Sequence, residues 1–234
     1  MKRRLLRKIS SELIPIIEQD GLIFWLDSEI SSSYSGSGTN WHDIVGGLDC
    51  TIVDGTFNGA TKTMNFSALN EYINVPSLNV NPNGGYTFTT FLKITSYNTI
   101  GNPGFWRYID GLNIGSFNVM QYNFGLDGAP WVRINNNDTL KPVSGWVMPL
   151  STYVMISFVI TDSSTIKVYE NGVEKHSVAN AYVQNDFIVN YLNYQFTTDQ
   201  NMFANYKNFI FYDKPLSSAA VLNNYNDLSS FYTL

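Results

Sequence analysis

Residues 208–227 of the chain read NFIFYDKPLSSAAVLNNYND. Phe209 to Tyr212 form an aromatic and aliphatic run that is typical of the middle of a β-strand. Pro215 cannot donate to a strand ladder, so the Asp-Lys-Pro sequence predicts a tight turn after the strand. Ser217 or Ser218 can then cap a short helix. The apolar positions of this helix are Val221, Leu222 and Tyr225. A last strand followed by a surface helix is one way in which a β-sandwich can end.

The composition also favours a β-rich domain. Aromatic residues make up 15% of the 234 residues, charged residues make up only 14%, and the chain contains 27 asparagines. Aromatic residues favour strands and asparagine favours turns. With 44% hydrophobic residues, the chain can bury a sizeable core. One large sandwich therefore suits this length.

Alternating and continuous apolar runs predict the individual strands. Residues 21–27 form a continuous apolar run, as expected for a strand that is covered on both faces. Residues 86–94 and 153–161 alternate between apolar and polar positions. Asn171-Gly172 separates two further alternating runs, which is the strongest short hairpin signal. We expect other strands at 48–53, within 62–75, and near 105–109, 117–124 and 131–135. Trp41 and Cys50 are expected in the core.

Five motifs carry a family resemblance. They are the closing stretch at 208–227, GLIFWLD at 21–27, YSGSGTNWHDIVG at 34–46, MNF…NEYINVP within 64–76 and IKVYENG at 166–172. They resemble the concanavalin A-like, laminin-G-type jelly-roll domains. Two positions depart from the pattern: alanine replaces the usual Glu after Ser217, and Val45 replaces a Ser. Many such domains occur in tailed-phage virion proteins. The resemblance implies an all-β jelly-roll sandwich, with a short N-terminal helix or arm and a short C-terminal helix. It constrains function weakly, because one fold hosts many functions.

The N-terminal segment differs in charge from the rest of the chain. Residues 1–20 carry a net charge of +2, whereas residues 21–234 carry −7. The apolar residues Leu5, Ile9 and Leu13 recur every four positions, which predicts a short amphipathic helix over residues 2–13 that ends near Pro15. Two interpretations stay open: a docking arm, or a terminal helix on the edge of the sandwich. The candidate docking residues are Lys2, Arg3, Arg4, Leu5, Arg7, Lys8 and Ile9. We therefore divide the chain into an arm, residues 1–20, and a domain, residues 21–234.

Several classes of function are disfavoured. The acidic domain is a poor nucleic-acid binder. No apolar run reaches about 18 residues, and the basic N-terminus lacks the apolar core of a signal peptide, so we expect neither a membrane span nor secretion. A single cysteine excludes an intrachain disulfide.

We also expect no enzymatic activity. Retaining glycosidases need two carboxylates about 5 Å apart, and related glucanases place them as Glu-x-Asp-x-x-Glu on one strand. None of the six glutamates forms that pattern. A nucleophile elbow, a zinc-type histidine cluster and a phosphate-binding glycine loop are absent from the sequence.

Cofactors are not expected, although a structural calcium ion without assigned ligands stays open. The loop carboxylates that could contribute to it are Asp43, Asp110, Asp127 and Asp138.

Glycan binding is the more specific hypothesis for residues 97–150, the least regular part of the sequence. Sugars stack on aromatic rings and form hydrogen bonds with amides and carboxylates. The candidate glycan-binding residues are Trp106, Tyr108, Asp110, Trp131 and Asn136. The alternative, that these aromatic side chains fill the core or an interface, is favoured for Trp131 and stays open for Trp106 and Tyr108.

The sequence therefore leads to two hypotheses. The first is a non-enzymatic virion structural protein of a tailed phage, assembled in the host cytoplasm and docked to other virion proteins through residues 1–20. It would decorate the capsid or belong to a head fibre or tail, and a homo-oligomer is an open alternative. The second is a carbohydrate-binding module that recognises cell-surface glycans.

Overall fold

The structure is a computed structural model that describes residues 7–9, 12–81, 83–96, 104–108, 119–122, 130–133, 141–142, 146–161, 165–179, 186–194 and 202–232. For residues 7–9, 12–13 and the strands between 104 and 142, only the backbone is described.

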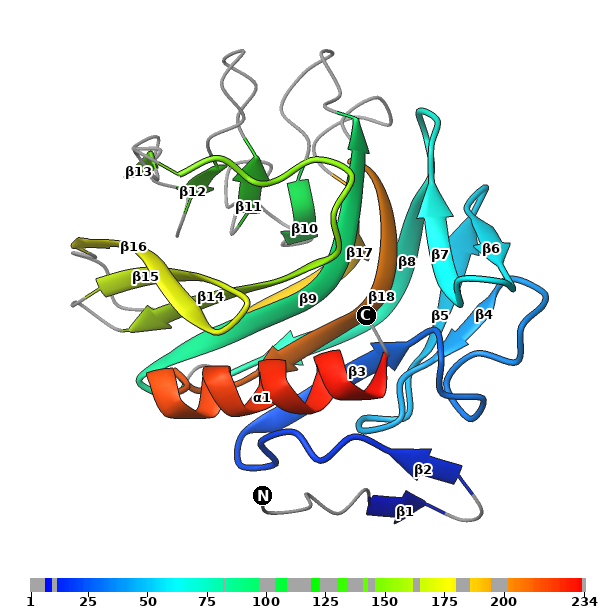
Figure 1. Cartoon of the computed structure of the whole chain (residues 1–234), viewed down its shortest axis with the longest axis horizontal. Helices are drawn as coiled ribbons and strands as arrows, with labels where there is room; N and C mark the ends of the chain where they lie inside the picture. Colours follow the sequence, from blue (N-terminus) through cyan, green and yellow to red (C-terminus); the bar gives the residue numbers. More distant parts are fainter. Residues whose placement is uncertain are drawn as a thin grey trace.

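Two antiparallel sheets lie face to face and form the sandwich (Figure 1). Sheet 1 contains eight strands in the order β13 (Lys141–Pro142), β12 (Pro130–Arg133), β11 (Val119–Tyr122), β10 (Gly104–Tyr108), β17 (Phe187–Leu192), β8 (Tyr72–Val80), β5 (Asp49–Val53) and β4 (Asn40–His42). Sheet 2 contains β16 (Val173–Ala179), β15 (Thr165–Glu170), β14 (Val154–Thr161), β9 (Gly85–Ser96), β18 (Phe203–Tyr212), β7 (Thr63–Phe66) and β6 (Thr56–Asn58), and β3 (Leu22–Asp27) also pairs with β18. The predicted all-β sandwich is confirmed.

The last strand, β18, organises sheet 2. Its whole length pairs with β9 on one edge. On the other edge, residues 204–206 pair with β7 and residues 208–212 pair with β3. The first and last predicted strands of the sequence are therefore neighbours, and the stretch from which the fold was predicted lies at the centre of this sheet.

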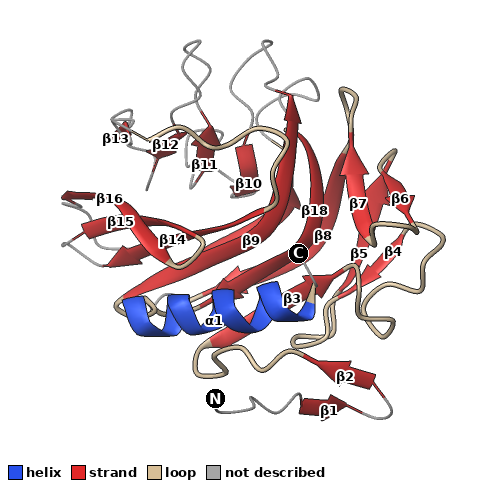
Figure 2. Ribbon diagram, viewed as in Figure 1, coloured by secondary structure: helices blue, strands red, loops and turns tan. Residues whose placement is uncertain are grey.

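The predicted C-terminal helix is confirmed as α1 (Ser218–Phe231), which lies across the outer face of sheet 2 (Figure 2). The hydroxyl of Ser217 accepts a hydrogen bond from the N–H of Ala220, as expected of an N-cap. Val221 is buried, but Leu222, which we expected on the apolar face, is 43% exposed. In the described part of the chain, no helix is both long enough and apolar enough to cross a membrane, and α1 has only 14 residues.

Two hydrophobic clusters fill the layers between these elements. The larger cluster lies between the sheets and includes Trp41, Cys50 and Phe88, as predicted for the first two. The second lies between sheet 2 and α1 and includes Phe91 and Met155. Because sheet 2 is covered on both faces, its central strands are buried at nearly every position.

The predicted hairpin around Asn171-Gly172 is also confirmed. It joins β15 to β16, and the φ angles of the two turn residues are 51° and 78°. Both angles lie in the left-handed region that this tight turn requires, which Asn and Gly tolerate best.

The helix predicted over residues 2–13 is wrong where the structure describes that segment. Residues 7–9 form β1 (Arg7–Ile9) and residues 12–14 form β2 (Glu12–Ile14), and the two strands pair with each other in an antiparallel hairpin. Ser10 and Ser11 separate the strands, and serine favours turns over helix interiors. A period of four residues in so short a segment could not outweigh this preference.

Residues 14–20 lie against the domain. Ile14 and Ile17 are only 3% and 2% exposed and belong to the cluster under α1. The N–H of Glu18 donates to the Oδ1 atom of Asn224 in α1 at 2.7 Å. The β1–β2 hairpin itself forms a two-stranded sheet separate from both large sheets (Figure 1).

Candidate functional site

Three tyrosine rings gather at one end of β8 and β17, on the outer face of sheet 1. The ring centroids of Tyr72 and Tyr191 are 5.7 Å apart, those of Tyr72 and Tyr194 are 5.0 Å apart, and those of Tyr191 and Tyr194 are 4.9 Å apart. All three side chains are half-buried, so each ring keeps part of its surface accessible. We call this group the tyrosine platform.

Strand alternation places these rings outside the core. Ile73 and Leu192 are fully buried between the sheets, and the residues that precede them, Tyr72 and Tyr191, therefore point to the opposite face. The contact between the rings depends on the pairing of β8 with β17, because these strands are far apart in the sequence.

Polar side chains continue the same face beside the platform. Asn74 is directly opposite Tyr191, and Thr51 of β5 is directly opposite Asn74. Both Asn74 and Thr51 are exposed. The arrangement offers apolar ring faces next to an amide and a hydroxyl, which can both donate and accept hydrogen bonds.

Asn193 holds the platform in place. Its Oδ1 atom accepts hydrogen bonds from the N–H of Met202 (3.0 Å) and the hydroxyl of Tyr206 (2.9 Å). Its Nδ2 group donates to the carbonyl oxygens of Glu71 (3.2 Å) and Met202 (3.1 Å). Asn193 is fully buried and lies between Leu192 and Tyr194 in the sequence, so it ties the end of β17 to the start of β8 and β18.

Two buried carboxylates have structural partners. Asp43, one of the predicted loop carboxylates for calcium, is fully buried and accepts hydrogen bonds from the N–H groups of Trp25, Val45 and Gly46 at 2.8, 3.0 and 2.9 Å. Burial raises the pKa of Asp43. Glu71 accepts from the N–H groups of Ser67 and Ala68. Both carboxylates therefore fix loops.

Metal ligands are not brought together in the part of the chain that the structure describes. No group of three or more His, Cys, Asp or Glu residues there could hold a metal ion. The other predicted loop carboxylates, Asp110, Asp127 and Asp138, lie outside the described residues.

The glycan-binding residues predicted from the sequence belong to a different part of sheet 1. Trp106 and Tyr108 lie on β10, in register with Leu192 and Val189 of β17, and Trp131 lies on β12, in register with Gln121. The side chains of all three are outside the described part, as are Asp110 and Asn136 entirely. Their role in glycan binding stays a prediction.

The tyrosine platform is a site that the sequence did not predict. Tyr72 belongs to the family motif within 64–76, whereas Tyr191 and Tyr194 belong to none of the motifs. One signal was present: Tyr72 alternates with the apolar Ile73 and Val75, which predicts an outward ring. The partner of that ring could not be read from the sequence, because it depends on which strands pair.

Comparison with solved structures identifies the fold. The Trypanosoma rangeli sialidase superimposes on 98% of this chain with a TM-score of 0.65 and 12% sequence identity, and the chain spans 36% of that protein. Domain 4 of AbnA, an extracellular GH43 arabinanase from Geobacillus stearothermophilus solved with arabinotriose, matches 88% of this chain and 99% of its own, with a TM-score of 0.63 and 16% identity. The receptor-binding domain of botulinum neurotoxin type G matches 88% of this chain and 51% of its own, with a TM-score of 0.58 and 15% identity.

The chain has the concanavalin A-like β-sandwich fold. At these identities the likeness establishes the fold of the sandwich and nothing finer. No protein-family model and no curated protein matches the sequence. None of the three structures comes from a phage, so the virion part of the sequence resemblance stays a prediction.

Proposed function

We propose that this concanavalin A-like sandwich is a non-catalytic carbohydrate-binding domain, and that the tyrosine platform is its binding surface. The observation that carries the proposal is the cluster of half-buried rings of Tyr72, Tyr191 and Tyr194 beside the exposed Asn74 and Thr51. A sugar ring presents an apolar face of C–H groups and a rim of hydroxyls. Aromatic faces and adjacent amides complement both parts.

The names of two structural neighbours support a carbohydrate ligand. Domain 4 of the arabinanase was solved in complex with arabinotriose, and this chain covers nearly all of that domain. The Trypanosoma rangeli sialidase was solved with sialic acid, but this chain corresponds to only part of it. The arabinanase domain is therefore the more direct support, because it is comparable in extent to this chain.

The proposal that the domain is non-catalytic rests on the carboxylates. Glycoside hydrolysis commonly needs two carboxylates that flank the bond to be cleaved. Asp43 and Glu71 are occupied by backbone N–H groups.

We expect Tyr191→Ala to weaken glycan binding at least tenfold, because truncating a central aromatic contact commonly costs about 1.4 kcal/mol or more. Tyr191→Phe should retain most of the affinity, since it keeps the ring face. Arabinotriose titration by calorimetry and a glycan array, each with calcium and with a chelator, measure the effect.

Asn79→Ala is the matched control, because Asn79 is exposed and lies on β8, the strand that carries Tyr72, but away from the three rings. If the folded wild-type protein retains no glycan under either condition, the proposed function is wrong. If Tyr191→Ala binds as tightly as the wild type, the platform is not the site.

We also propose, as the second candidate, the virion role predicted from the sequence, in which the arm docks to other virion proteins. One observation supports it: β1 and β2 form a two-stranded sheet that is separate from both large sheets, and β1 contains Arg7 and Lys8, two of the five basic residues of the arm. Residues 14–20, in contrast, contribute to the domain through Ile14 and Ile17.

A truncation that removes residues 1–11 should therefore leave the domain folded and abolish its incorporation into particles. We expect a change in melting temperature of less than about 3 °C, because this truncation keeps the buried Ile14 and Ile17. Removal of residues 1–20 should destabilise the domain, since Ile14 and Ile17 go with it. Quantitative mass spectrometry of gradient-purified particles gives the readout, and normal incorporation of the shorter truncation would refute the docking role.

A further inference from the structure

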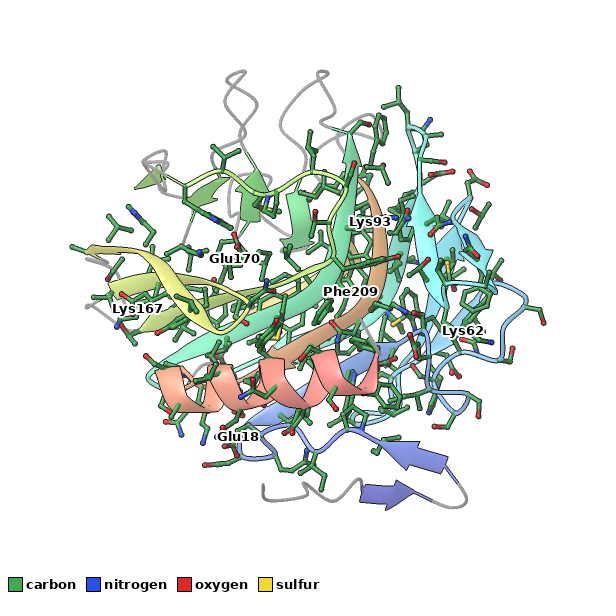
Figure 3. The ribbon with its side chains drawn as sticks, viewed as in Figure 1. Glu18, Lys62, Lys93, Lys167, Glu170 and Phe209 are labelled. Atoms are coloured by element: carbon green, nitrogen blue, oxygen red, sulfur yellow. The ribbon has the colours of Figure 1, made fainter. Side chains whose placement is uncertain are left out.

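A second polar surface lies on sheet 2, beyond the end of α1. Asn65 of β7 is directly opposite Asn205 of β18, and Asn205 is directly opposite Lys93 of β9. Strand alternation places Lys93 on the same outer face as Phe91, which packs under the helix. Figure 3 shows Lys93 over the curved part of sheet 2, clear of α1. We call Asn65, Asn205 and Lys93 the donor row.

Lys93 differs from three other lysines of the domain. Lys207 pairs with Glu29, Lys167 pairs with Glu174, and Lys214 pairs with Asp20. Lys93 has no carboxylate partner among the described residues. Its ammonium group lies 5.0 Å from the centre of the Tyr153 ring, which orients it without neutralising its charge.

The nearby charges leave Lys93 as the source of positive potential. Lys207 also approaches the Tyr153 ring, at 5.8 Å, but Glu29 neutralises it. The net charge of the row itself is therefore positive, although the whole domain is acidic. An unpaired cation can attract an anion locally even when the domain as a whole is acidic.

The two asparagines add hydrogen-bond donors to this charge. The hydroxyl of Thr63 donates to the Oδ1 atom of Asn65 at 2.9 Å, which leaves the amide hydrogens of Asn65 for another partner. Asn65, Asn205 and Lys93 are all half-buried, so they are held by the sheet and still accessible. Neighbouring strands are about 4.8 Å apart, so the row spans about 10 Å, the size of one substituted sugar ring.

We infer that the donor row binds a carboxylate-bearing monosaccharide unit, such as a uronic or a nonulosonic acid. Lys93 would pair with the carboxylate through a charge-assisted hydrogen bond, and the amides of Asn65 and Asn205 would bind ring hydroxyls. The Tyr153 ring would flank the sugar. This site lies on the opposite sheet from the tyrosine platform, so it extends the proposed function and can fail independently of it.

The test compares acidic and neutral sugars on the full chain. Galacturonate, N-acetylneuraminate, galactose and acetate are titrated into the protein, and binding is followed by NMR chemical shifts. We expect both acidic sugars to bind, with galactose and acetate at least about tenfold weaker. Lys93→Gln should weaken binding of the acidic sugars by about tenfold or more, and higher salt should weaken it in the wild type.

Two variants make the result specific. Lys62→Gln is the matched control, because Lys62 also lies over an aromatic ring, that of Phe57, and should bind acidic sugars normally. Tyr191→Ala should leave acidic-sugar binding unchanged while it weakens binding to the platform. The inference is overturned if the wild type binds no acidic sugar, if acetate or galactose binds as tightly, or if Lys93→Gln has no effect.

Discussion

The free energy of unfolding is expected to fall by about 4 kcal/mol as the pH rises from about 4 to about 7, because of one buried acid, Asp27. Asp27 is fully buried at the end of β3, next to the last residue of the described chain, Tyr232. Burial raises the pKa of Asp27 from 3.8 to about 7 and outweighs three hydrogen bonds that lower it. The nearby charge of Glu29 raises this pKa further.

The hydrogen bonds show why this acid matters to the helix. The Tyr232 hydroxyl donates to the Oδ2 atom of Asp27 at 2.6 Å, and the Nε1 group of Trp25 donates to the same oxygen at 3.2 Å. Asn208 of β18 donates to the Tyr232 hydroxyl at 2.7 Å. The C-terminal end of α1 is therefore fastened to sheet 2 through Asp27 and Asn208.

The sign of the pH effect follows from the direction of the shift. Below pH 3.8 the carboxyl is protonated in both the folded and the unfolded chain. Between pH 3.8 and about 7 the folded state keeps the proton that the unfolded state has lost, so each further pH unit weakens folding by about 1.4 kcal/mol. Above about pH 7 both states are ionised and this contribution is fully lost.

Urea unfolding between pH 4.5 and 8, on the wild type and on Asp27→Asn, measures this dependence. The variant mimics the neutral acid, so its stability relative to the wild type should rise with pH. A shallow slope should remain, because burial also raises the pKa of Asp43. Asp49→Asn is the control: Asp49 is exposed, and its hydrogen bond with His42 lowers its pKa, so the wild-type slope should persist. Equal slopes for the wild type and Asp27→Asn would contradict the assignment.

Asn193→Ala should destabilise the domain by roughly 3–5 kcal/mol, which for a chain of this size lowers the melting temperature by about 10 °C. The variant removes four hydrogen bonds and leaves the N–H of Met202 and the hydroxyl of Tyr206 buried without this partner. Asn193 also has a φ angle of 55°, which alanine adopts at a cost of about 1 kcal/mol.

Asn193→Gly separates these two causes. Glycine adopts a positive φ freely but makes none of the side-chain hydrogen bonds, so it should recover only about 1 kcal/mol relative to alanine. If Asn193→Gly is as stable as the wild type, the hydrogen bonds are unimportant. At temperatures where it is folded, this variant should also bind glycan less tightly, because Tyr194 follows Asn193 directly. Asn79→Ala, at an exposed position, should change stability by less than about 0.5 kcal/mol.

Elements that depend on local chemistry could be predicted from the residues alone. The strand at Phe209–Tyr212, the Ser217 cap and the Asn171-Gly172 turn are each specified by neighbouring residues, and the structure confirms all three. The alternation of residues 153–161 also predicted which side chains face the core, since a strand has a fixed period of two. The exception was the N-terminal segment. Its apolar residues recur every four positions and predicted a helix, but residues 7–9 and 12–14 form two strands.

The neighbours of each strand, and therefore the sites, follow from the folded arrangement of the two sheets. The tyrosine platform requires the pairing of β8 with β17, and the donor row requires that of β7, β18 and β9. The burial that raises the pKa of Asp27 depends on the whole fold, which also brings Tyr232 from the opposite end of the chain to form a hydrogen bond with Asp27 at the end of β3. Each of these sites is built from residues far apart in the sequence, and such contacts follow from strand pairing and burial in the whole fold, which no local pattern of residues encodes.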